Sequence, residues 1–564
     1  MKRGIFKIAL FLSFSAITTS SFAATFSAPK DGYVSHVNTP VLSLQTPNLK
    51  AIHEEDAIND ANHYLYRFAV ATQVNITTEN SGAWFTQLNG DRVWQLEVAY
   101  PGAAGLSFLF ERFVVHGNTT FDAFSKEGKK LHTTFDASEV LEHGRQNMDL
   151  CAGSNMILQL VEPKGTTPSE IYINTIHFAY RGMYNSSIEK INESDPCEVN
   201  ANCSPEGNEY LEEQRGVVRV YVVEPAGAGW CSGSVVNNKA GDCKPLVLTA
   251  LHCGVNSSAA NFNQFKFYFG YEASGCTNPT SVGSLASHSV TGCVKLADSN
   301  DGGGNSGSDF LLVQMGTLAT EATTIAKIKG PNYKAFWNGW DATTTASTGG
   351  VSIHHPAGDI KKISTYSTTL TTTGWGISGT HWRVKWDATT NGHGVTEGGS
   401  SGSPIFTFNG GNSRIVGTLT GGSSFCTSPN SPDSYGKMSY HWTSNGTPAN
   451  EQLKTYLDPT NTGVLVLDGS WDPCNGSVSL EEKHVLEGIK IYPNPASDVI
   501  MIDLSALSSE ATVRIYDLSG KLLMERNNLN SSVNELNISG LTNGMYQVVV
   551  ESAAGQITRK ITKM

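Results

Sequence analysis

The stretch "GVTEGGSSGSPIF" (residues 394–406) places two adjacent serines between glycines, ahead of a proline and an apolar pair. Gly-Ser clusters are commonly plain turns, so the stretch by itself leaves open whether Ser400 or Ser401 is a nucleophile. A serine hydroxyl becomes an effective nucleophile beside a base, and the base needs a carboxylate that orients it. The interpretation of this stretch therefore depends on finding a histidine and an acid elsewhere in the chain.

A histidine in suitable surroundings lies in "LVLTALHCGV" (residues 246–255). His252 directly follows an apolar run that is typical of a buried strand. A lone histidine at a strand end is more often structural than catalytic, but a disulfide at the neighbouring Cys253 would hold the imidazole in place. His252 is therefore the candidate for the general base.

The acid is expected at the start of another strand, "SDFLLVQM" (residues 308–315). Asp309 leads into this apolar run, a position that is unfavourable for a carboxylate unless it is hydrogen-bonded. Asp298 and Asp301 lie in or beside the Gly-rich loop that precedes the run, and we expect both to be solvated. Asp309 is the better candidate.

The N-terminus predicts export. Lys2 and Arg3 precede the apolar run "IALFLSFSAI", and small residues then lead to a predicted cleavage after Ala23, the pattern of a secretory signal peptide. In an oxidising compartment the ten cysteines can form disulfides. Charged residues make up only 16% of the chain, and the net charge of −12 comes with no basic patch, which argues against nucleic-acid binding.

Composition and patterning divide the 564 residues into successive segments. A helix is expected over "AIHEEDAINDANHYLYRFAV" (residues 51–70), and strands follow it, which predicts an α+β unit. The cysteine-rich middle of the chain shows many short β-like runs between Gly-, Asn- and Ser-rich turns, typical of an all-β barrel or sandwich. The predicted segments are a signal peptide (1–23), a propeptide (24–190), a protease domain (191–470), a linker (471–487) and a small β-sandwich (488–564).

The order of His252, Asp309 and Ser401 along the chain is that of the chymotrypsin-type serine proteases. "TALHC" resembles the TAAHC box of that family, "SDFLLVQM" resembles its acid-bearing strand, and "GSSGSP" resembles its GDSGGP box. Aligning the last pair places Ser401, not Ser400, at the nucleophile. The resemblance implies an all-β-dominated fold with a double β-barrel.

A narrower resemblance covers residues 191–465, which are similar to the bacterial lysyl endopeptidases, secreted serine proteases that cut after lysine. The stretches that carry this resemblance are "CSGSVVNN", "TALHCG", "FWNGWD", "IHHP", "GVTEGGSSGSPIF" and "DSYGK".

The resemblance implies a role for each residue of the site. Ser401 would attack the substrate carbonyl, His252 would accept its proton, and Asp309 would orient the imidazole. The backbone N–H groups of Gly399 and Ser401 would form the oxyanion hole. Asp433 would provide the negative charge of the S1 pocket for lysine; without the resemblance, it would be interpreted as an Asx-turn residue beside a proline. Whether the pocket also accepts arginine stays open.

The chain departs from these families at two positions. Ser400 replaces the aspartate that pairs with the freed N-terminus in digestive enzymes, so we expect an inhibitory, folding-assisting propeptide instead of activation by that ion pair. Trp375 is retained, but Thr420, next to Gly421, takes the place of a histidine that stacks on this tryptophan in lysyl endopeptidases. Trp375, Thr420 and Gly421 are our candidates for substrate binding.

Cleavage after Lys190 would release Ile191 as the new N-terminus, close to where the mature chain of the family begins. The predicted specificity then matches the predicted processing site. The alternative is that Lys190 is only an exposed linker residue.

The resemblance implies the disulfides Cys197–Cys426, Cys203–Cys276 and Cys231–Cys253. Pairing of Cys243 with Cys293 is an independent guess, and Cys151 and Cys474 stay unassigned. We expect neither a metal site nor a cofactor.

The C-terminal stretches "YPNPA", "IYDLSGK" and "GMYQVVV" resemble the type IX secretion sorting domain. They imply recognition by that secretion machinery and passage through an outer membrane; a sugar- or wall-binding module is the alternative. The sequence thus predicts an extracellular serine endopeptidase, made as a self-processing precursor, that acts on proteins and peptides after lysine. The alternatives are a trypsin-like protease that also accepts arginine and a catalytically inactive surface adhesin on a protease scaffold.

Overall fold

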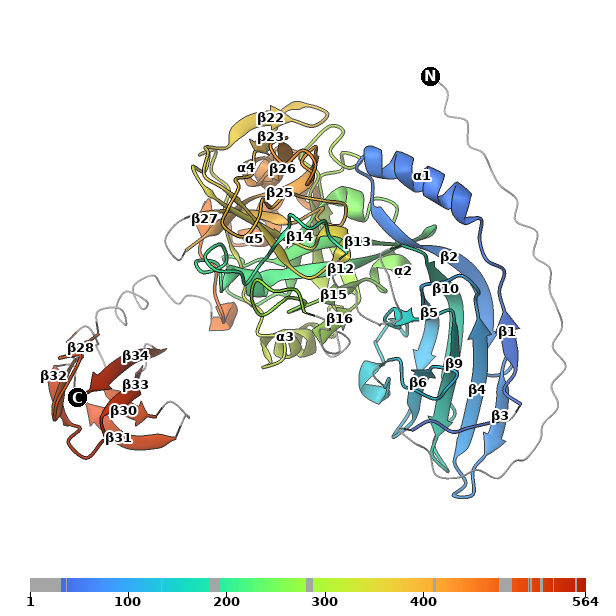
Figure 1. The fold of residues 1–564 in the computed structure, drawn as a ribbon, viewed down its shortest axis with the longest axis horizontal. Coiled ribbons are helices and arrows are strands. Elements are labelled where there is room, and N and C mark those ends of the chain that lie inside the picture. Colours follow the sequence, from blue (N-terminus) through green and yellow to red (C-terminus); the bar gives the residue numbers. More distant parts are fainter. Residues whose placement is uncertain are drawn as a thin grey trace. The chain divides into compact units, whose positions relative to one another are not determined.

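The protein is described by a computed structural model, and its chain forms two compact units, Met1–Asp472 and Pro473–Met564 (Figure 1). The described residues are 32–36, 38–132, 134–181, 193–279, 288–408, 412–475, 489–505, 507, 510–517, 521–530, 532–552 and 555–564. The expected signal peptide lies outside these residues.

The N-terminal part of the first unit consists of curved sheets (Figure 1) and, among the described residues, the single α-helix α1 (Leu49–Ala61). Buried aromatic and aliphatic side chains, among them Trp94, Phe108 and Phe121, fill its core. A five-stranded sheet has the order β1-β4-β9-β6, with β3 on β4. The elements are β1 (Val41–Ser43), α1 (Leu49–Ala61), β2 (Tyr66–Thr77), β3 (Ala83–Thr86), β4 (Arg92–Ala99), β5 (Gly105–Val114), β6 (Thr120–Phe124), β7 (Gln146–Asn147), β8 (Cys151–Ala152), β9 (Asn155–Glu162) and β10 (Glu170–Ala179).

The helix expected over residues 51–70 is shorter than predicted. It starts at Leu49, where the side chain of Asn48 accepts a hydrogen bond from a backbone N–H of the first turn, and it ends at Ala61. His63 then has a φ of 55°, which a continuing helix does not allow. The following residues form β2 because they pair on both sides with other strands, so tertiary pairing overrides the helical pattern.

The rest of the first unit consists mainly of strands (Figure 1). They are arranged as two β-barrels, which confirms the predicted fold class. The first barrel contains β12 (Val217–Glu224), β13 (Gly227–Val235), β14 (Leu246–Thr249), β15 (Lys266–Tyr268), β16 (Ser289–Thr291), β17 (Cys293–Asp298) and β18 (Leu311–Met315). The sheet of the second barrel contains β11 (Val199–Asn200), β19 (Gly339–Asp341), β20 (Gly350–His354), β21 (Lys362–Tyr366), β22 (Thr371–Gly374), β23 (Ser378–Val384), β24 (Pro404–Thr407), β25 (Arg414–Gly422), β26 (Asp433–Lys437) and β27 (Val466–Leu467). The helices are α2 (Ala259–Phe262), α3 (Glu321–Lys329), α4 (Met438–Thr443) and α5 (Lys454–Leu457).

One continuous sheet joins the N-terminal part to the first barrel. In this 12-stranded sheet, β13 pairs with β12 on one side and with β2 on the other. The antiparallel register places Trp230 opposite Tyr66 and Ala228 opposite Ala69. The predicted propeptide therefore adds its own strands to the edge of the protease barrel.

The disulfides Cys197–Cys426, Cys203–Cys276 and Cys231–Cys253 are confirmed. The guess that Cys243 pairs with Cys293 is wrong. Cys293 is a buried free thiol at the start of β17, and Cys243 is disulfide-bonded without it. Cys151, which the sequence left unassigned, is also a buried free thiol.

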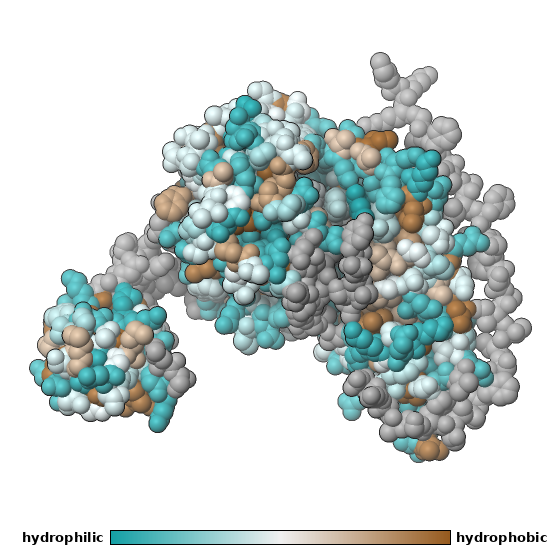
Figure 2. Space-filling model, in the orientation of Figure 1, coloured by the Kyte–Doolittle hydropathy of each residue, from teal (hydrophilic) through white to brown (hydrophobic). Residues whose placement is uncertain are grey.

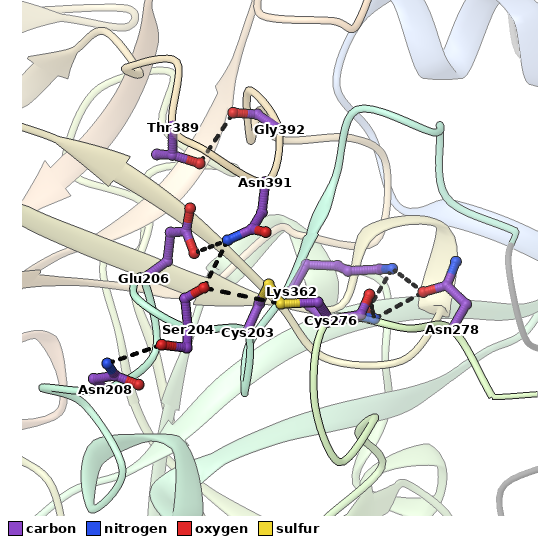
Figure 3. The surroundings of a disulfide bond; sticks show 11 residues. Cys203, Ser204, Glu206, Asn208, Cys276, Asn278, Lys362, Thr389, Asn391 and Gly392 are labelled. Atoms are coloured by element: carbon purple, nitrogen blue, oxygen red, sulfur yellow. Dashed lines mark hydrogen bonds between the residues drawn. A yellow bond between two sulfur atoms is a disulfide. The ribbon is translucent and has the colours of Figure 1, made fainter.

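The Cys203–Cys276 disulfide lies within a network of hydrogen bonds that connects loops far apart in the sequence (Figure 3). Asn391 donates from Nδ2 to the carbonyl oxygen of Ser204 at 2.8 Å and to Glu206 Oε2 at 2.7 Å. The residues after Gly392 lead into the "GVTEGG" segment, so the network supports the chain that precedes Ser401.

The second unit is the predicted small sandwich. A three-stranded sheet (β28-β29-β32) and a four-stranded sheet (β31-β30-β33-β34) enclose an aliphatic core that includes Ile500, Ile515 and Val548. Its strands are β28 (Lys490–Tyr492), β29 (Val499–Asp503), β30 (Ala511–Tyr516), β31 (Leu522–Leu529), β32 (Val533–Asn537), β33 (Gly544–Ser552) and β34 (Gly555–Lys563).

Hydrophobic and hydrophilic residues are interspersed on the visible faces of both units (Figure 2). Among the described residues, no helix has the length and apolar character needed to cross a membrane.

Candidate active site

His252 and Asp309 form a buried pair at the end of the first barrel. His252 lies in the short 3₁₀ turn Leu251–Cys253 that follows β14. Its Nδ1 is 2.7 Å from Asp309 Oδ2, and its backbone N–H donates to Asp309 Oδ1 at 2.9 Å. Because the carboxylate accepts from Nδ1, the neutral imidazole presents Nε2 as its basic nitrogen.

The surroundings of His252 favour its protonated form. Burial lowers the pKa of the imidazole, but the negative charge of Asp309 and the hydrogen bond that its carboxylate accepts from Nδ1, with smaller contributions from Asp301 and Glu224, outweigh this effect. The net result is a pKa above the ordinary histidine value. A neighbouring carboxylate that stabilises an imidazolium is what a general base needs when it accepts a proton.

Asp301 is buried, which corrects the expectation that it is solvated. Its Oδ2 accepts from the backbone N–H of Asp309 at 2.8 Å, and its Oδ1 accepts from Gly303 at 3.0 Å and Gly304 at 2.8 Å. These bonds compensate for burial and hold Asp309 at a φ of 57°. Asp298 is mostly buried too, and its carboxylate accepts from Lys295 Nζ at 2.7 Å. The sequence did not reveal that Asp301 supports Asp309, because the loop's many glycines indicate a turn but do not show which side chain the turn encloses.

Ser401 lies half-buried in the loop before β24. Its carbonyl oxygen accepts from the backbone N–H of Ser232 at 2.8 Å, and the Cys231–Cys253 disulfide joins the residues next to Ser232 and His252. The chain geometry thus brings Ser401 beside the histidine turn. The Ser401 hydroxyl and His252 form no hydrogen bond, because His252 Nε2 has no partner among the described residues. Such bonds are often long before substrate is bound.

The two predicted oxyanion donors are the backbone N–H groups that flank Ser400. Within the part of the chain that the structure describes, the backbone N–H groups of Gly399 and Ser401 donate no hydrogen bond. Gly399 has a φ of 97°, and a Cβ there would lie 2.8 Å from the backbone nitrogen of Gly358. Glycine is therefore required at this position.

Asp433, at the start of β26, is fully buried among hydrogen-bond donors rather than lying in an exposed turn. Its Oδ2 accepts from Trp386 Nε1 at 2.6 Å, Thr396 Oγ1 at 2.8 Å and Ser424 Oγ at 2.5 Å. Among the described residues, its Oδ1 accepts only from the backbone N–H of Ser424, at 3.1 Å, and so retains acceptor capacity. Burial raises the pKa of Asp433, while these hydrogen bonds oppose the rise. Sequence reasoning missed Trp386, Thr396 and Ser424, since no local pattern marks them.

Trp375, Thr420 and Gly421, the candidates for substrate binding, lie together. A Cβ on Gly421 would be 3.0 Å from the Trp375 ring. Thr420 Oγ1 is 2.9 Å from Nε2 of His381, a buried residue that the sequence did not single out. A residue of the N-terminal part reaches the same place, because the His63 ring packs edge-on against Trp375 with centroids 5.1 Å apart. The predicted processing residues Lys190 and Ile191 lie outside the described residues.

A double β-barrel that carries a buried histidine–aspartate pair on one barrel and a serine loop on the other defines a chymotrypsin-like serine endopeptidase. Residues 191–436 match the family described as the lysyl endopeptidase C-terminal domain, and residues 490–564 match the secretion system C-terminal sorting domain. The chain is thus a serine endopeptidase that is similar over residues 191–436 to the lysyl endopeptidases, with a type IX secretion sorting domain at its end. It is a secreted protein.

Comparison with known proteins finds further similarities. The lysyl endopeptidase of Pseudomonas aeruginosa PAO1 is 23% identical over 376 residues, which cover 64% of this chain and 74% of that protein. Among solved structures, the thermostable serine protease AL20 from an extremophilic microorganism is 16% identical, with a TM-score of 0.29, and the match covers 42% of this chain and 98% of that one. Protease Anisep from Arthrobacter nicotinovorans is 17% identical, with a TM-score of 0.29, over 40% of this chain and 90% of that one.

Proposed function

We propose that the processed enzyme hydrolyses peptide bonds on the carboxyl side of lysine, using Ser401, His252 and Asp309. The observation that carries this proposal is the buried His252–Asp309 pair, whose basic nitrogen has no partner among the described residues. Ser401 Oγ attacks the carbonyl carbon, and its proton moves to His252 Nε2. The imidazolium then donates this proton to the leaving amine, and a water molecule repeats the sequence to release the acyl group.

The oxyanion that forms on the carbonyl oxygen accepts from the N–H groups of Gly399 and Ser401. Both groups are free of protein acceptors in the described residues, so they are available when negative charge develops. One such donor is worth about 3 kcal/mol of transition-state stabilisation.

Asp433 gives the proposed preference for lysine. Its carboxylate is buried with no Lys, Arg or His among its hydrogen-bond donors in the described residues, and one oxygen has spare acceptor capacity. A lysine ammonium at the end of the substrate pocket would supply the missing positive charge. The donors around Asp433 are small or rigid groups, which do not by themselves decide whether an arginine also fits.

Asp433→Asn is expected to reduce kcat/KM for a lysine amide substrate about 10²-fold or more, because the ammonium then lies buried without a counter-charge, at a cost of about 3 kcal/mol. Hydrolysis of a small uncharged ester should be nearly unchanged. The matched control is Asp458→Asn, a buried carboxylate that caps the turn at Thr462 and lies elsewhere. Equal losses on the lysine amide and the uncharged ester would refute the specificity assignment.

We also propose that residues 24–190 act as an inhibitory propeptide and that residues 191–470 form the protease. Residues 63–66 lie against the candidate substrate site. A Cβ on Gly229 would be 2.4 Å from Leu65 Cγ, a Cβ on Gly398 would be 2.3 Å from Tyr66 Cδ2, and a Cβ on Gly421 would be 2.9 Å from the His63 ring. Residues 63–66 include no lysine, so this segment covers the site without presenting a lysine to it.

An uncut precursor carrying Lys190→Gln should therefore be nearly inactive toward lysine peptides. Adding Leu65→Asp, which buries a carboxylate against Gly229, should detach the segment and raise the activity of this uncut precursor at least tenfold. Leu88→Asp is the control, since Leu88 is 85% exposed and its replacement should leave the precursor inactive. Full activity of the Lys190→Gln precursor would contradict inhibition by the propeptide.

A further inference from the structure

The residue before the proposed nucleophile is a serine, so the chain lacks the buried aspartate that would pair there with a freed N-terminus. The loop that carries Gly399 and Ser401 nevertheless has both candidate oxyanion amides free in the uncut chain, within the described residues. Some other interaction must hold this loop in shape.

A hydrogen-bond relay through His354 joins Ser400 to the start of the same loop. The Nδ1 of His354 lies 2.7 Å from Ser400 Oγ, and its Nε2 lies 3.1 Å from Ser364 Oγ. Ser364 Oγ donates to the carbonyl oxygen of Val395 at 2.7 Å, and Ser400 Oγ accepts from the backbone N–H of Glu397 at 3.2 Å.

These contacts allow one proton arrangement. Because the Ser364 hydroxyl donates to Val395, its oxygen must accept from His354 Nε2–H. The Nδ1 of the neutral ring is then an acceptor, and the Ser400 hydroxyl donates to it. The donors of the relay therefore all point in one direction, from the N–H of Glu397 to the carbonyl oxygen of Val395. Both ends of the relay lie in the short segment just before Ser401.

The neutral ring that this arrangement requires is favoured by burial. His354 is fully buried, and burial, with a smaller contribution from Lys362, lowers its pKa to about 3. The nearest carboxylate is Glu198, 3.9 Å from Nε2, and burial raises the pKa of Glu198 well above its ordinary value. The relay is thus not interrupted by protonation of the ring near neutral pH.

The residues after His354 hold the loop's backbone. The N–H of Ala357 donates to the carbonyl oxygen of Gly398 at 2.6 Å. Ser232 Oγ accepts from the N–H of His355 at 2.9 Å and donates to the carbonyl oxygen of Gly399 at 2.9 Å.

These bonds determine where the oxyanion amides point. In a trans peptide the C=O and N–H groups point in opposite directions. Since the carbonyl of Gly398 is bound by Ala357, the N–H of Gly399 points away from Ala357. In the same way the carbonyl of Ser400 accepts from the N–H of Ser403 at 2.9 Å, which directs the N–H of Ser401 away from it.

We propose that His354, Ser364 and Ser400 are positioning residues that keep the oxyanion hole formed without a contribution from a freed N-terminus. This inference rests on the proposed function, because it assigns a role for the amides of Gly399 and Ser401. Ala357, with a φ of 51°, completes the support by holding the Gly398–Gly399 peptide plane.

The test compares His354→Ala, His354→Gln, Ser364→Ala and Ser400→Ala with Thr365→Val. Thr365 neighbours Ser364 on β21, and its buried hydroxyl has no partner among the described residues, so the control removes a similar group outside the relay. Each full-length variant is processed with tagged wild-type enzyme, which is then removed. The measurements are kcat and KM for a lysine amide and inhibition constants for a lysine-terminated peptide aldehyde and for n-butylamine.

For His354→Ala and Ser400→Ala we expect kcat to fall about 10²-fold and aldehyde inhibition to weaken by a similar factor, because a poorly placed oxyanion donor affects only tetrahedral species. KM and butylamine inhibition should stay within about threefold, since both report the ground state. His354→Gln, which can accept and donate at once, should recover part of kcat, and Thr365→Val should match the wild type.

Unchanged kcat in the relay variants, or equal weakening of aldehyde and butylamine inhibition, would overturn the inference. If the wild-type enzyme itself does not cleave lysine amides, the proposed function fails, and this result is distinct from a failure of the relay.

Discussion

Replacing Ser401 by alanine is expected to reduce kcat/KM for lysine peptides about 10⁶-fold. The substitution removes the oxygen that forms the acyl-enzyme bond while leaving the His252–Asp309 pair in place. The same variant should keep its propeptide attached, since we propose that the enzyme cuts after Lys190 itself. The measurements are peptide hydrolysis and mass spectrometry of the secreted protein.

The matched control for this prediction is Ser423→Ala, an exposed serine in the segment that follows β25. It should retain full activity and be processed normally. Substantial hydrolysis by Ser401→Ala would show that the nucleophile is another group. Normal processing of this variant in a host without other proteases would show that Lys190 is cut by a different mechanism.

Asp309→Asn is expected to lower kcat about 10⁴-fold with little change in KM. Asp309 accepts hydrogen bonds from both the side chain and the backbone N–H of His252. An asparagine amide has one acceptor oxygen instead of two and carries no negative charge, so it replaces neither both bonds nor the stabilisation of the imidazolium. Steady-state kinetics on a lysine amide measures the effect, and circular dichroism checks that the protein stays folded.

Asp298→Asn provides the matched control, because Asp298 lies close in sequence but binds Lys295 on its own strand. Its activity should stay within about twofold of the wild type, because the ion pair that it loses is partly exposed to solvent on Lys295 and does not contact His252. If Asp298→Asn lowers kcat as much as Asp309→Asn does, the effect comes from disturbed folding of this region and not from the loss of support for His252.

The fold class, the C-terminal sandwich and the pairing of His252 with Asp309 could be predicted because their signals are local. An apolar strand followed by His252, an aspartate that opens another strand, and a Gly-Ser turn are each visible in a few consecutive residues. The three disulfides came from the family resemblance, whereas the independent guess of Cys243 with Cys293 failed because spacing carries no information on which cysteines meet in space.

What could not be predicted depends on contacts between distant residues. The helix expected to continue to residue 70 ends at Ala61, because the next residues pair with β13, far along the chain. Asp301 is buried because it accepts N–H groups from its own glycine loop and from Asp309. The donors around Asp433 and the relay through His354 likewise come from separate strands, and no single stretch of sequence marks them.

The most direct measurement is digestion of a peptide library by the processed enzyme beside Ser401→Ala, read as the frequency of each residue before the cleaved bond. We predict lysine before nearly all bonds cut by the wild-type enzyme and no cleavage by the variant. Frequent cleavage after uncharged residues, or the same cleavage pattern from both proteins, would contradict the proposed lysine-specific serine mechanism.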